Sequence, residues 1–417
     1  MESPVRKYML QLLEETRGQD GGELADYIPE LAKARPDVFA IAMTTIEGRT
    51  YSVGDDEREF TIQSISKPFA YAAALTDRGL DAVAAKVGVE PTGEAFNELS
   101  LERGTNRPKN PLINAGAITI HSMLAEPGSS LEERAERTVE FFSRLAGRHL
   151  EMDESVFRSE LETADRNFAL AHMLRNLGVF EEHAHQAVAG YVAQCAIKVT
   201  VRDLAVMGAT LANRGVHPFT GEHVASREVA RQVLAVMVSA GMYDASGTWF
   251  SNVGIPAKSG VSGGILGVLP GQVGIGVMSP RLDRQGNSVR GVRVFNKLSQ
   301  DMGLHLLDAG IFGSNVIRSV SEEPHETIMR MQGVIQFSGA EAIMHRLAGL
   351  ECASGTMVFD LSRVTRLDAM ARRMFLEGLR RLIADGHRVE IIDPDDVLPD
   401  PNLGGDVYPV QRESDRG

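Results

Sequence analysis

The chain has 417 residues, of which 43% are hydrophobic and 24% are charged. This length fits two or three domains, and the composition is that of a globular protein rather than of a disordered, collagen-like or coiled-coil chain. The formal net charge of −13 repels phosphate backbones, so we expect no nucleic-acid partner.

The sequence shows no targeting or membrane signal. Residues 1–20 lack the apolar stretch of a signal peptide, and no run reaches the ~18 apolar residues that a membrane span needs. The two cysteines, Cys195 and Cys352, are typical of a reducing compartment and do not form a metal-type Cys/His cluster. We therefore expect a cytoplasmic protein with no membrane partner and no metal site.

Hydrophobic periodicity predicts the elements of the first three hundred residues. Residues 6–34 have a helical pattern interrupted at Gly21-Gly22, and the runs 38–45 and 50–53 form a strand hairpin. Helical pattern then dominates from 64 to about 240, after which strands return before a closing helix. The clearest helices are 70–76, 131–146, 166–177, 202–213 and 292–303, and the later strands are 255–258, 265–269 and 273–278. The two groups of strands flank the helices and are expected to join in one antiparallel sheet.

The pattern changes near residue 312. Residues 313–324 are predicted to be a linker, and strand and helix patterns alternate beyond it, which indicates a small α/β domain over 325–417. Its strands are predicted at 331–337, 356–361 and 389–392, and its helices at 341–347 and 369–384. The polar tail from 394 to 417 is expected to be frayed. Residues 1–312 would then form the first, larger domain.

Ser64 and Lys67 form a Ser-x-x-Lys motif just after the hairpin, at a predicted helix start. Pro68 supports that placement because it has no amide hydrogen to continue a helix backwards. Residues three apart on a helix share a face, so the hydroxyl and the amine can meet. A neutral lysine can take the proton of a serine nucleophile, and burial or a nearby cation would keep it neutral. Taken alone, the motif is more often a helix cap and a surface lysine.

A second stretch, Lys258-Ser259-Gly260, follows a strand-like run and favours the chemical interpretation. Acyl-transfer enzymes of the penicillin-recognising kind pair Ser-x-x-Lys with such a downstream segment. Its lysine would act as a second cation near Lys67, and the amide of Val261 would join that of Ser64 in an oxyanion hole. The alternative for this stretch alone is a glycine-rich turn.

Further motifs occur in chain order and are specific as a set: Ala25-Asp26-Tyr27-Ile28-Pro29, Ile62-Gln63-Ser64-Ile65-Ser66-Lys67-Pro68, Asn110-Pro111-Leu112-Ile113-Asn114-Ala115-Gly116-Ala117-Ile118, Ser159-Glu160, Asp165-Arg166-Asn167, Tyr191 before Cys195, Asp203-Leu204-Ala205, Gly241-Met242-Tyr243-Asp244 and Gly286-Asn287-Ser288-Val289. Through them the sequence from about 20 to 310 resembles the bacterial-type glutaminases, whose fold is serine β-lactamase-like. The expected fold class is therefore an antiparallel sheet with a helical insert, followed by the small α/β domain.

The resemblance implies hydrolysis of L-glutamine to L-glutamate and ammonia. It assigns Ser64 as the nucleophile, Lys67 as its base and Tyr191 as a proton relay, with Lys258, Ser259 and Gly260 in support. The positions that would contact glutamine are Tyr27, Gln63, Asn114, Glu160, Asn167, Tyr191, Tyr243 and Val261. Glu160 suits the substrate ammonium, and the amides and tyrosines suit its carboxylate. Singly, these residues would be caps, solvated charges and core-edge tyrosines.

The implied mechanism is acyl transfer in two steps, and it needs no metal or organic cofactor. Ser64 attacks the carboxamide while Lys67 takes the proton directly or through Tyr191, ammonia leaves, and water hydrolyses the glutamyl ester. Cys195 lies in an apolar run and is expected in the core rather than as a nucleophile.

The C-terminal region resembles the STAS domains of anti-sigma-factor antagonists and sulfate transporters. The resemblance is carried by 333–339, by 357–368 with the following amphipathic helix, and by 386–389. In the phosphorylated antagonists a serine follows the aspartate at the helix start, whereas Ala369 follows Asp368 here, so phosphoserine switching is not expected. A protein partner or oligomerisation is favoured, and the alternative is a structural appendage.

Two other functions compete with a glutaminase. One is a serine amidohydrolase or transpeptidase of the same fold that acts on a peptide or lactam, and the other is a sensory scaffold without activity. The residues suited to a zwitterion argue against the first, and the presence of both Ser64 and Lys67 argues against the second. We also expect a homo-oligomer, a dimer or tetramer.

Overall fold

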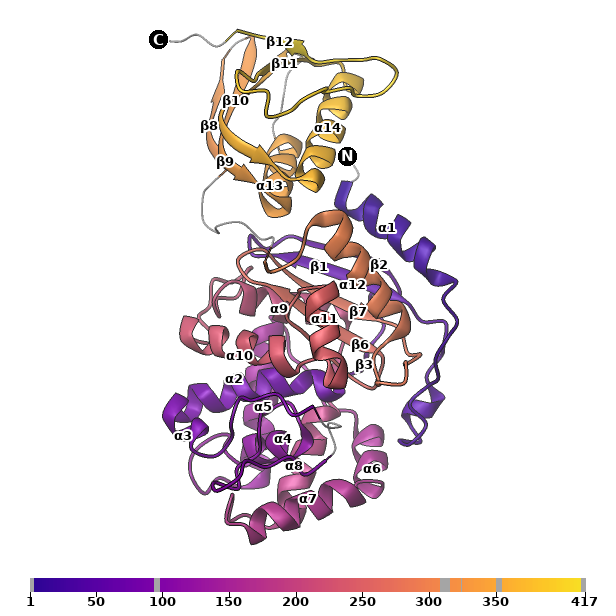
Figure 1. Ribbon diagram of the computed structural model, residues 1–417, viewed down its shortest axis with the longest axis vertical. Coiled ribbons are helices and arrows are strands. Elements are labelled where there is room, and N and C mark those ends of the chain that lie inside the picture. Colours follow the sequence, from indigo (N-terminus) through magenta and orange to yellow (C-terminus); the bar gives the residue numbers. More distant parts are fainter. Residues whose placement is uncertain (1–3, 94–97, 308–315, 324, 350–354, 414–417) are drawn as a thin grey trace. The chain divides into compact units, whose positions relative to one another are not determined.

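The computed structural model describes residues 4–93, 98–307, 316–323, 325–349 and 355–413. The chain divides into two compact units. The larger unit is Met9–Asn296, and the smaller unit combines Met1–Tyr8 with Lys297–Gly417. Figure 1 shows the elements of both units.

A five-stranded antiparallel sheet forms the centre of the larger unit. Its order is β2-β1-β7-β6-β5, so the first hairpin pairs with the late strands through β1 and β7, with Ala42 opposite Gly276. The strands are β1 (Ala40–Thr45), β2 (Thr50–Gly54), β5 (Ala257–Ser259), β6 (Gly264–Leu269) and β7 (Val273–Met278). The prediction that the two groups of strands join in one antiparallel sheet is confirmed.

Helices pack on both faces of this sheet, and glycines allow the close approach. A side chain at Gly276 of β7 would lie 2.4 Å from the carbonyl oxygen of Val201, so α9 (Val201–Ala212) lies directly on the strand backbone. On the opposite face, Gly267 of β6 leaves room for the ring of Phe295 from α12 (Val289–Met302). These contacts bury the strands completely, and every residue of β1, β6 and β7 is buried.

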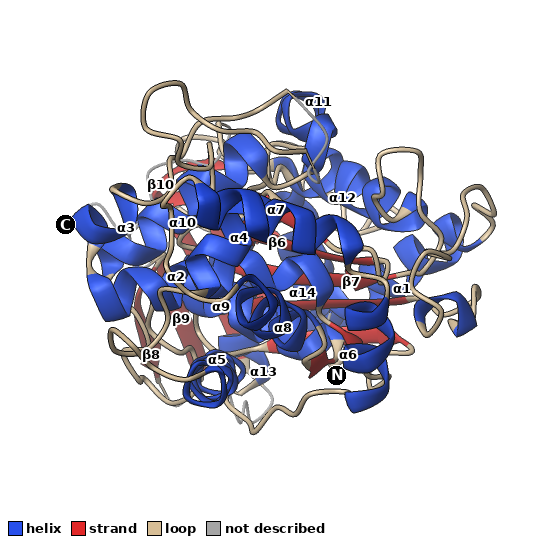
Figure 2. Cartoon of the chain, turned by 90° about the horizontal axis from the view of Figure 1, so that it is seen from below, coloured by secondary structure: helices blue, strands red, loops and turns tan. Residues whose placement is uncertain are grey.

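The helical insert lies between β2 and β5 in the sequence. Its helices are α2 (Ser66–Arg78), α3 (Leu80–Ala84), α4 (Asn114–His121), α5 (Leu131–Ala146), α6 (Glu154–Glu162), α7 (Asp165–Asn176), α8 (Ala184–Cys195), α9, α10 (Arg227–Ala240) and α11 (Ser246–Asn252). Helices α4, α7 and α8 pack around one apolar core that includes Ile118, Leu174 and Val188 (Figure 2). The strand β3 (Phe60–Thr61) pairs with β4 (Lys198–Val199) and connects the sheet region to α2.

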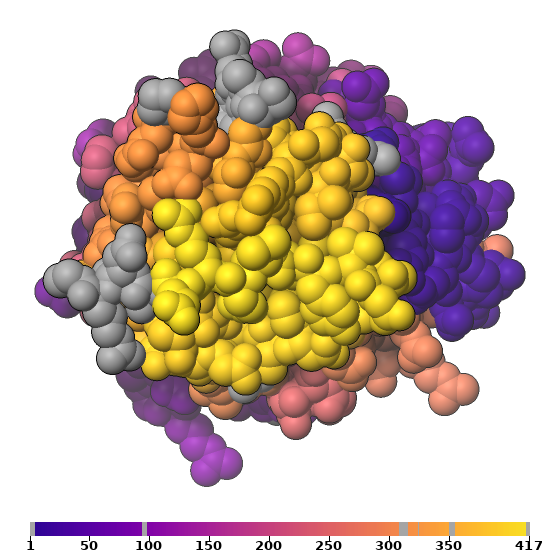
Figure 3. All heavy atoms as spheres, turned by 90° about the horizontal axis from the view of Figure 1, so that it is seen from above, coloured from indigo at the N-terminus to yellow at the C-terminus, as the bar shows by residue number. Residues whose placement is uncertain are grey.

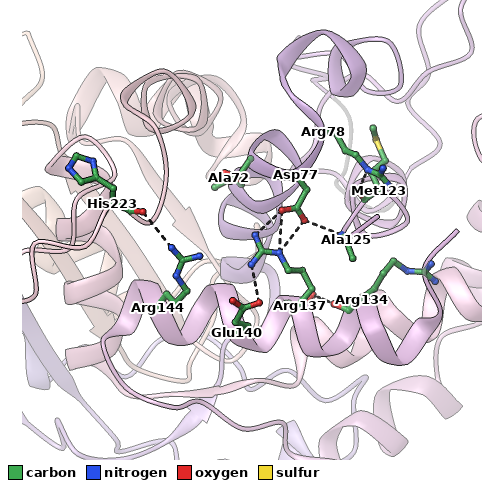
Figure 4. A network of polar contacts seen from close by, with 12 residues as sticks. Ala72, Asp77, Arg78, Met123, Ala125, Arg134, Arg137, Glu140, Arg144 and His223 are labelled. Atoms are coloured by element: carbon green, nitrogen blue, oxygen red, sulfur yellow. Dashed lines mark hydrogen bonds and ion pairs between the residues drawn. The ribbon is translucent and has the colours of Figure 1, made fainter. Parts of the chain in front are cut away.

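The C-terminal end of α2 is fixed by ionic contacts with α5 and the loop before it (Figure 4). Asp77 accepts from Arg137 Nη2 at 2.7 Å and from the backbone amide of Ala125 at 3.0 Å. Arg78 Nε donates to the carbonyl of Met123 at 2.9 Å. Because these groups are partly buried and charged, their hydrogen bonds are of the stronger kind and hold α2 in place.

The smaller unit contains a second five-stranded sheet, in the order β12-β11-β10-β9-β8. The strands are β8 (Ile317–Glu322), β9 (Glu326–Ile335), β10 (Thr356–Leu367), β11 (Arg388–Ile392) and β12 (Val410–Gln411), and the helices are α13 (Phe337–Ala348) and α14 (Ala369–Ala384). Strands β9, β10 and β11 are parallel, and Phe359 of β10 meets Phe375 of α14 edge to face at 5.3 Å. The predicted alternation of strand and helix is confirmed.

Two local predictions need correction here, and a third, on the C-terminal tail, follows below. The helical region 6–34 contains only α1 (Pro4–Arg17) and a short 3-10 turn at Leu31–Lys33, because the glycine-rich stretch after α1 includes Gly22 at a φ of 87°. The expected linker 313–324 is wrong for Ile317–Glu322, which pair with β9 as β8; residues 313–315 and 324 lie outside the described residues.

The tail predicted to be frayed is ordered over residues 394–413. Its Leu398 and Leu403 are buried, and the guanidinium of Arg372 in α14 donates to the carbonyls of Pro399 and Asp400. The tail then adds β12 to the sheet. In Figure 3 the chain from α14 onward, in yellow, forms one continuous face of this unit. Residues 414–417 lie outside the described residues, as does Cys352.

Candidate active site

Ser64 lies in a single 3-10 turn, Gln63–Ile65, that leads directly into α2. Gln63 has a φ of 51°, a left-handed conformation that is costly for a residue with a side chain. Its side-chain amide donates to Glu160 Oε2 of α6 at 3.1 Å, which stabilises the turn. The prediction of Ser64 at a helix start is confirmed, and the left-handed residue before it sets the direction of the turn.

Lys67 is completely buried in the first turn of α2, with 1% of its surface exposed. Its Nζ donates to Asn114 Oδ1 at 2.7 Å and to the carbonyl of Leu112 at 3.1 Å. Burial lowers the pKa of Lys67 to about 8, against a smaller opposing effect of Cys195 and Glu160. A substantial fraction of this amine is therefore neutral near pH 8, as a general base must be.

Asn114, the first residue of α4, links several helices at the site. Its Oδ1 faces Lys67 and lies 3.5 Å from the hydroxyl of Tyr191 on α8, and its Nδ2 donates to Asn167 Oδ1 on α7 at 2.9 Å. The Lys67 ammonium also lies 5.7 Å from the centre of the Tyr191 ring. The predicted residues Lys67, Asn114, Asn167 and Tyr191 are thus brought together from four helices.

Glu160 contributes a buried carboxylate, with 8% of the residue exposed. Burial raises its pKa to about 7, while the hydrogen bond from Gln63 and the charge of Lys67 act in the opposite direction. Near pH 7 this carboxyl group is only partly ionised. It would become a full counterion when a cationic group binds beside it.

Tyr243 approaches Ser64 from the segment before β5. It has a φ of 52°, and its hydroxyl hydrogen-bonds the Ser64 side chain and donates to the carbonyl of Ser259 at 3.2 Å. Because the single phenolic hydrogen goes to that carbonyl, the phenol oxygen accepts the hydrogen of Ser64. Burial raises the pKa of Tyr243 to about 12, so the phenol is neutral at physiological pH.

The comparisons with known proteins agree with one another. The family model described as Glutaminase matches residues 22–307. Curated relatives called glutaminase are 51% identical in Corynebacterium efficiens, over 95% of this chain and 94% of the relative, and 53% identical in Corynebacterium glutamicum, over 95% and 96%. The chain belongs to the glutaminase family.

The fold of this glutaminase is also similar to solved structures. The crystal structure of a protein described as Mglu is 54% identical, has a TM-score of 0.74, and is matched over 95% of this chain and all of the other. A probable glutaminase from Bacillus subtilis, solved in complex with 6-diazo-5-oxo-L-norleucine, is 36% identical with a TM-score of 0.67, over 73% of this chain and 97% of the other.

Two predicted residues of the glutaminase lie at the edge of this cluster rather than inside it. Tyr27 is 56% exposed, and together with Val261 it lines a cavity whose wall also includes the loop from Leu282 to Gly286. Val261 itself is buried in the tight turn that follows β5, where Gly260 donates to the carbonyl of Gly264 at 3.0 Å. A side chain at Gly260 would lie 3.0 Å from the side chain of Ile65 and 3.1 Å from the carbonyl oxygen of Ile62, so the Val261 side of the cavity is next to the Ser64 turn.

The predicted role of Lys258 as a second cation beside Lys67 stays a prediction. Burial lowers the pKa of Lys258 well below its ordinary value, and the charge of Lys67 lowers it further. Burial is also the largest cause of the lowered pKa of Lys67. Lys258 Nζ donates to the carbonyl of Ser259 at 2.7 Å and lies 4.0 Å from the centre of the Tyr243 ring, so it supports Tyr243.

The sequence did not predict two contacts of this site. One joins Tyr243 to Ser64, and the other joins Lys67 to the carbonyl of Leu112. Leu112 lies within the motif around Asn114, but every residue type has a backbone carbonyl, so residue identity cannot show which carbonyl accepts a hydrogen bond. Cys195 is buried, as predicted, and burial raises its pKa to about 12, so its thiol stays protonated.

Other features lie outside this cluster. A cavity of about 750 Å³ between α5 and α8 is lined mainly by apolar groups and shares no residue with the Ser64 cluster described above. Within the described residues, no group of three His, Cys, Asp or Glu side chains could hold a metal ion. In the same part of the chain, no helix combines the length and the apolar character needed to cross a membrane.

Proposed function

We propose that this glutaminase converts L-glutamine to L-glutamate and ammonia through an ester on Ser64, with Lys67 as the base. The observation that carries the proposal is the buried Lys67, whose pKa of about 8 lies near the working range of a general base. A neutral amine has two hydrogens and one lone pair. Leu112 and Asn114 hold the Nζ of Lys67 in the first turn of α2, three residues from Ser64, and the lone pair of its neutral form would accept the proton of Ser64.

Each pole of glutamine has a complementary group among the proposed contacts. The carboxylate of Glu160 would bind the substrate ammonium, and the amides of Asn114 and Asn167 would hold the amino-acid end. The tyrosine hydroxyls would donate to the substrate carboxylate. The residues in these roles are those of the sequence prediction: Tyr27, Gln63, Asn114, Glu160, Asn167, Tyr191, Tyr243 and Val261.

The bond changes are those of acyl transfer. Ser64 Oγ bonds to the amide carbon of the substrate, its proton passes to Lys67 directly or through Tyr191, and the amides of Ser64 and Val261 stabilise the oxyanion. The proton then moves to the leaving nitrogen, which departs as ammonia. Water then attacks the ester while Lys67 takes its proton; the bond to Ser64 Oγ breaks, this proton returns to Oγ, and glutamate leaves.

The decisive experiment is Ser64→Ala. We expect ammonia release from L-glutamine to fall by at least ~10³-fold, because removing the nucleophile leaves only binding and the oxyanion hole. Covalent labelling by 6-diazo-5-oxo-L-norleucine, followed by mass spectrometry, should modify Ser64 in the unmutated chain and nothing in the variant. Ser159→Ala is the matched control, because Ser159 is not among the predicted catalytic or glutamine-binding residues. Retained turnover in Ser64→Ala, or a label on another side chain, would remove Ser64 as nucleophile.

The fold and the smaller unit are parts of the same proposal. We propose that residues 1–312 form a serine β-lactamase-like catalytic domain and that 325–417 form a STAS-like domain that binds a protein partner or a second copy. The parallel strands β9, β10 and β11 with α13 and α14 support the second assignment. Ala369 and Met370 follow Asp368 at the start of α14, which argues against a phosphoserine switch there. Cytoplasmic location and a homo-oligomer stay predictions.

A further inference from the structure

A second set of buried polar residues lies behind the proposed catalytic residues. Ser66, His121 and Gln194 have at most 1% of their surface exposed, although each carries polar side-chain atoms. Buried polar groups are costly unless they are paired, so such a set needs a structural or functional reason.

The three residues form one ordered chain of hydrogen bonds. Gln194 Oε1 lies 3.2 Å from His121 Nδ1, and Gln194 Nε2 donates to Ser66 Oγ at 3.0 Å. Since an amide oxygen can only accept, His121 Nδ1 carries the hydrogen of that contact. Ser66 Oγ lies 4.0 Å from Cys195 Sγ, and Cys195 is hydrogen-bonded in turn to Tyr191.

The chain connects the same three helices that supply the proposed catalytic residues. Ser66 precedes Lys67 on α2, His121 lies two turns after Asn114 on α4, and Gln194 lies one turn after Tyr191 on α8. These helices contact one another pairwise. A shift of any of the three would therefore change the distances within Lys67, Asn114 and Tyr191.

Close packing leaves the histidine no other position. A side chain at Gly190 of α8 would lie 2.2 Å from His121 Nε2, so the ring rests against the backbone of α8. Within the described part of the chain, His121 Nε2 has no hydrogen-bond partner. Burial lowers the pKa of His121 to about 4, so the ring is neutral, with its hydrogen on Nδ1. In this position the ring of His121 bonds to Gln194 through Nδ1, while Nε2 faces the backbone of α8 without a hydrogen-bond partner among the described residues.

We infer that His121, Gln194 and Ser66 are positioning residues for the Ser64 reaction: their hydrogen-bond chain sets the spacing of α2, α4 and α8, and with it the geometry of Lys67, Asn114 and Tyr191. The inference rests on the proposed function. It predicts that the chain acts on the rate of the chemical step, because misplacement of reacting groups by about 1 Å can cost about 10²-fold.

The test compares two variants of similar size, His121→Asn and His121→Leu. The Asn amide nitrogen can replace Nδ1–H, whereas Leu fills the space but leaves Gln194 Oε1 unpaired. We expect kcat, measured per site titrated with 6-diazo-5-oxo-L-norleucine, to fall at least ~10-fold more in His121→Leu than in His121→Asn, and we expect KM to change less than kcat. A role in apolar packing alone gives the opposite order, because Leu is the better core residue.

Ser66→Ala and Thr210→Val complete the design. Ser66→Ala is a small change that removes the acceptor of Gln194, and we expect it to lower kcat even if both His121 variants fail to fold. Thr210 is equally buried, but among the described residues its hydroxyl bonds only to the carbonyls of Leu145 and Val206, so Thr210→Val should lower stability and leave kcat unchanged. The inference is wrong if the kcat of His121→Leu equals or exceeds the kcat of His121→Asn, or if Ser66→Ala keeps the full kcat of the unmutated chain. An unmutated chain without turnover or labelling would instead refute the proposed function.

Discussion

Burial of Lys67 lowers the free energy of unfolding of the chain and, by lowering the pKa of the amine, makes it reactive as a base. Its pKa is about 8 in the folded chain against 10.5 as an ordinary lysine, so between these values the unfolded chain binds more protons than the folded chain. The free energy of unfolding therefore rises with pH across that window, and the cost of the buried ammonium is fully present below pH 8. The same lowered pKa makes the amine available as a base.

This linkage can be measured with Lys67→Met. We expect the variant to lose turnover and to lack the pH dependence that Lys67 contributes. Relative to the unmutated chain, the Met variant should be most stable at pH 7. This relative stability, measured as the difference in unfolding free energy, should decrease by on the order of 3 kcal/mol as the pH rises to 10.5. Urea unfolding at four or five pH values measures it. A difference independent of pH would mean that Lys67 is not a buried, shifted amine.

Glu160 gives a separate pH effect on substrate binding. Its pKa of about 7 means that the carboxylate needed for the substrate ammonium forms as the pH rises through 7. We expect KM for L-glutamine to fall between pH 6 and 8 in the unmutated chain. Glu160→Gln should raise KM about 10-fold or more at pH 8, the loss of one charge-assisted contact, and flatten that dependence. Asp165→Asn, in the first turn of the neighbouring helix, is the control; a KM profile equal to that of Glu160→Gln would disprove the specific role.

At the scale of elements, α2 is held at both ends by polar contacts. Its first turn carries Lys67 and its last turn carries Asp77, which Arg137 of α5 binds through two nitrogens. The side chain of Asp77 is only 11% exposed, so removing Arg137 leaves a carboxylate that is largely out of water. The clamp therefore fixes the helix on which the proposed base lies.

Arg137→Met is expected to lower the free energy of unfolding by about 1–3 kcal/mol, because a partly buried charge loses its partner. The matched control is Arg158→Met, whose pair with Glu154 is mostly exposed and is expected to be worth less than about 0.5 kcal/mol. Thermal or urea unfolding of both variants measures the effect. Equal stability of the two variants would show that the Asp77 clamp is no stronger than a surface ion pair.

The sequence predicts the elements that have a clear apolar pattern and misses the strands whose residues are mostly polar. Apolar runs of strand length identified β1, β6 and β7, and the helical period identified α5, α9 and α14. The polar residues of β8 indicate a linker, whereas the structure shows a strand because this segment pairs with β9. The last stretch of the tail was missed for a similar reason, since β12 depends on β11.

The candidate site was predicted through motifs, and its geometry was beyond the sequence. The motifs named Ser64, Lys67 and Tyr243, but neither the left-handed conformation of Tyr243 nor the hydrogen bond between its hydroxyl and Ser64 could be predicted from them. Similarly, burial lowers the pKa of both Lys67 and Lys258, and composition does not reveal that either lysine is buried. Spacing along the chain identifies groups, whereas pKa and contacts follow from packing.

At the scale of the whole molecule, relatives of different length suggest which part is needed for catalysis. A glutaminase of Trichormus variabilis is 49% identical over 306 residues, which are 73% of this chain but 91% of the relative. The family model likewise ends at residue 307. Such relatives have little length left for a unit like the one that contains β8 to β12. We therefore expect catalysis by this chain to be independent of that unit.

The prediction is that a fragment of residues 1–312 keeps kcat and KM for L-glutamine within about 3-fold of the full chain, since every proposed catalytic and binding residue lies before residue 262. The fragment must end after α12, because Val289–Met302 is one continuous helix whose Phe295 covers the sheet at Gly267. A shorter fragment, 1–296, cuts this helix and should unfold or aggregate. Circular dichroism and site titration would establish folding before rates are compared. A folded 1–312 fragment that can be labelled at Ser64 but has no turnover would show that the C-terminal unit takes part in catalysis.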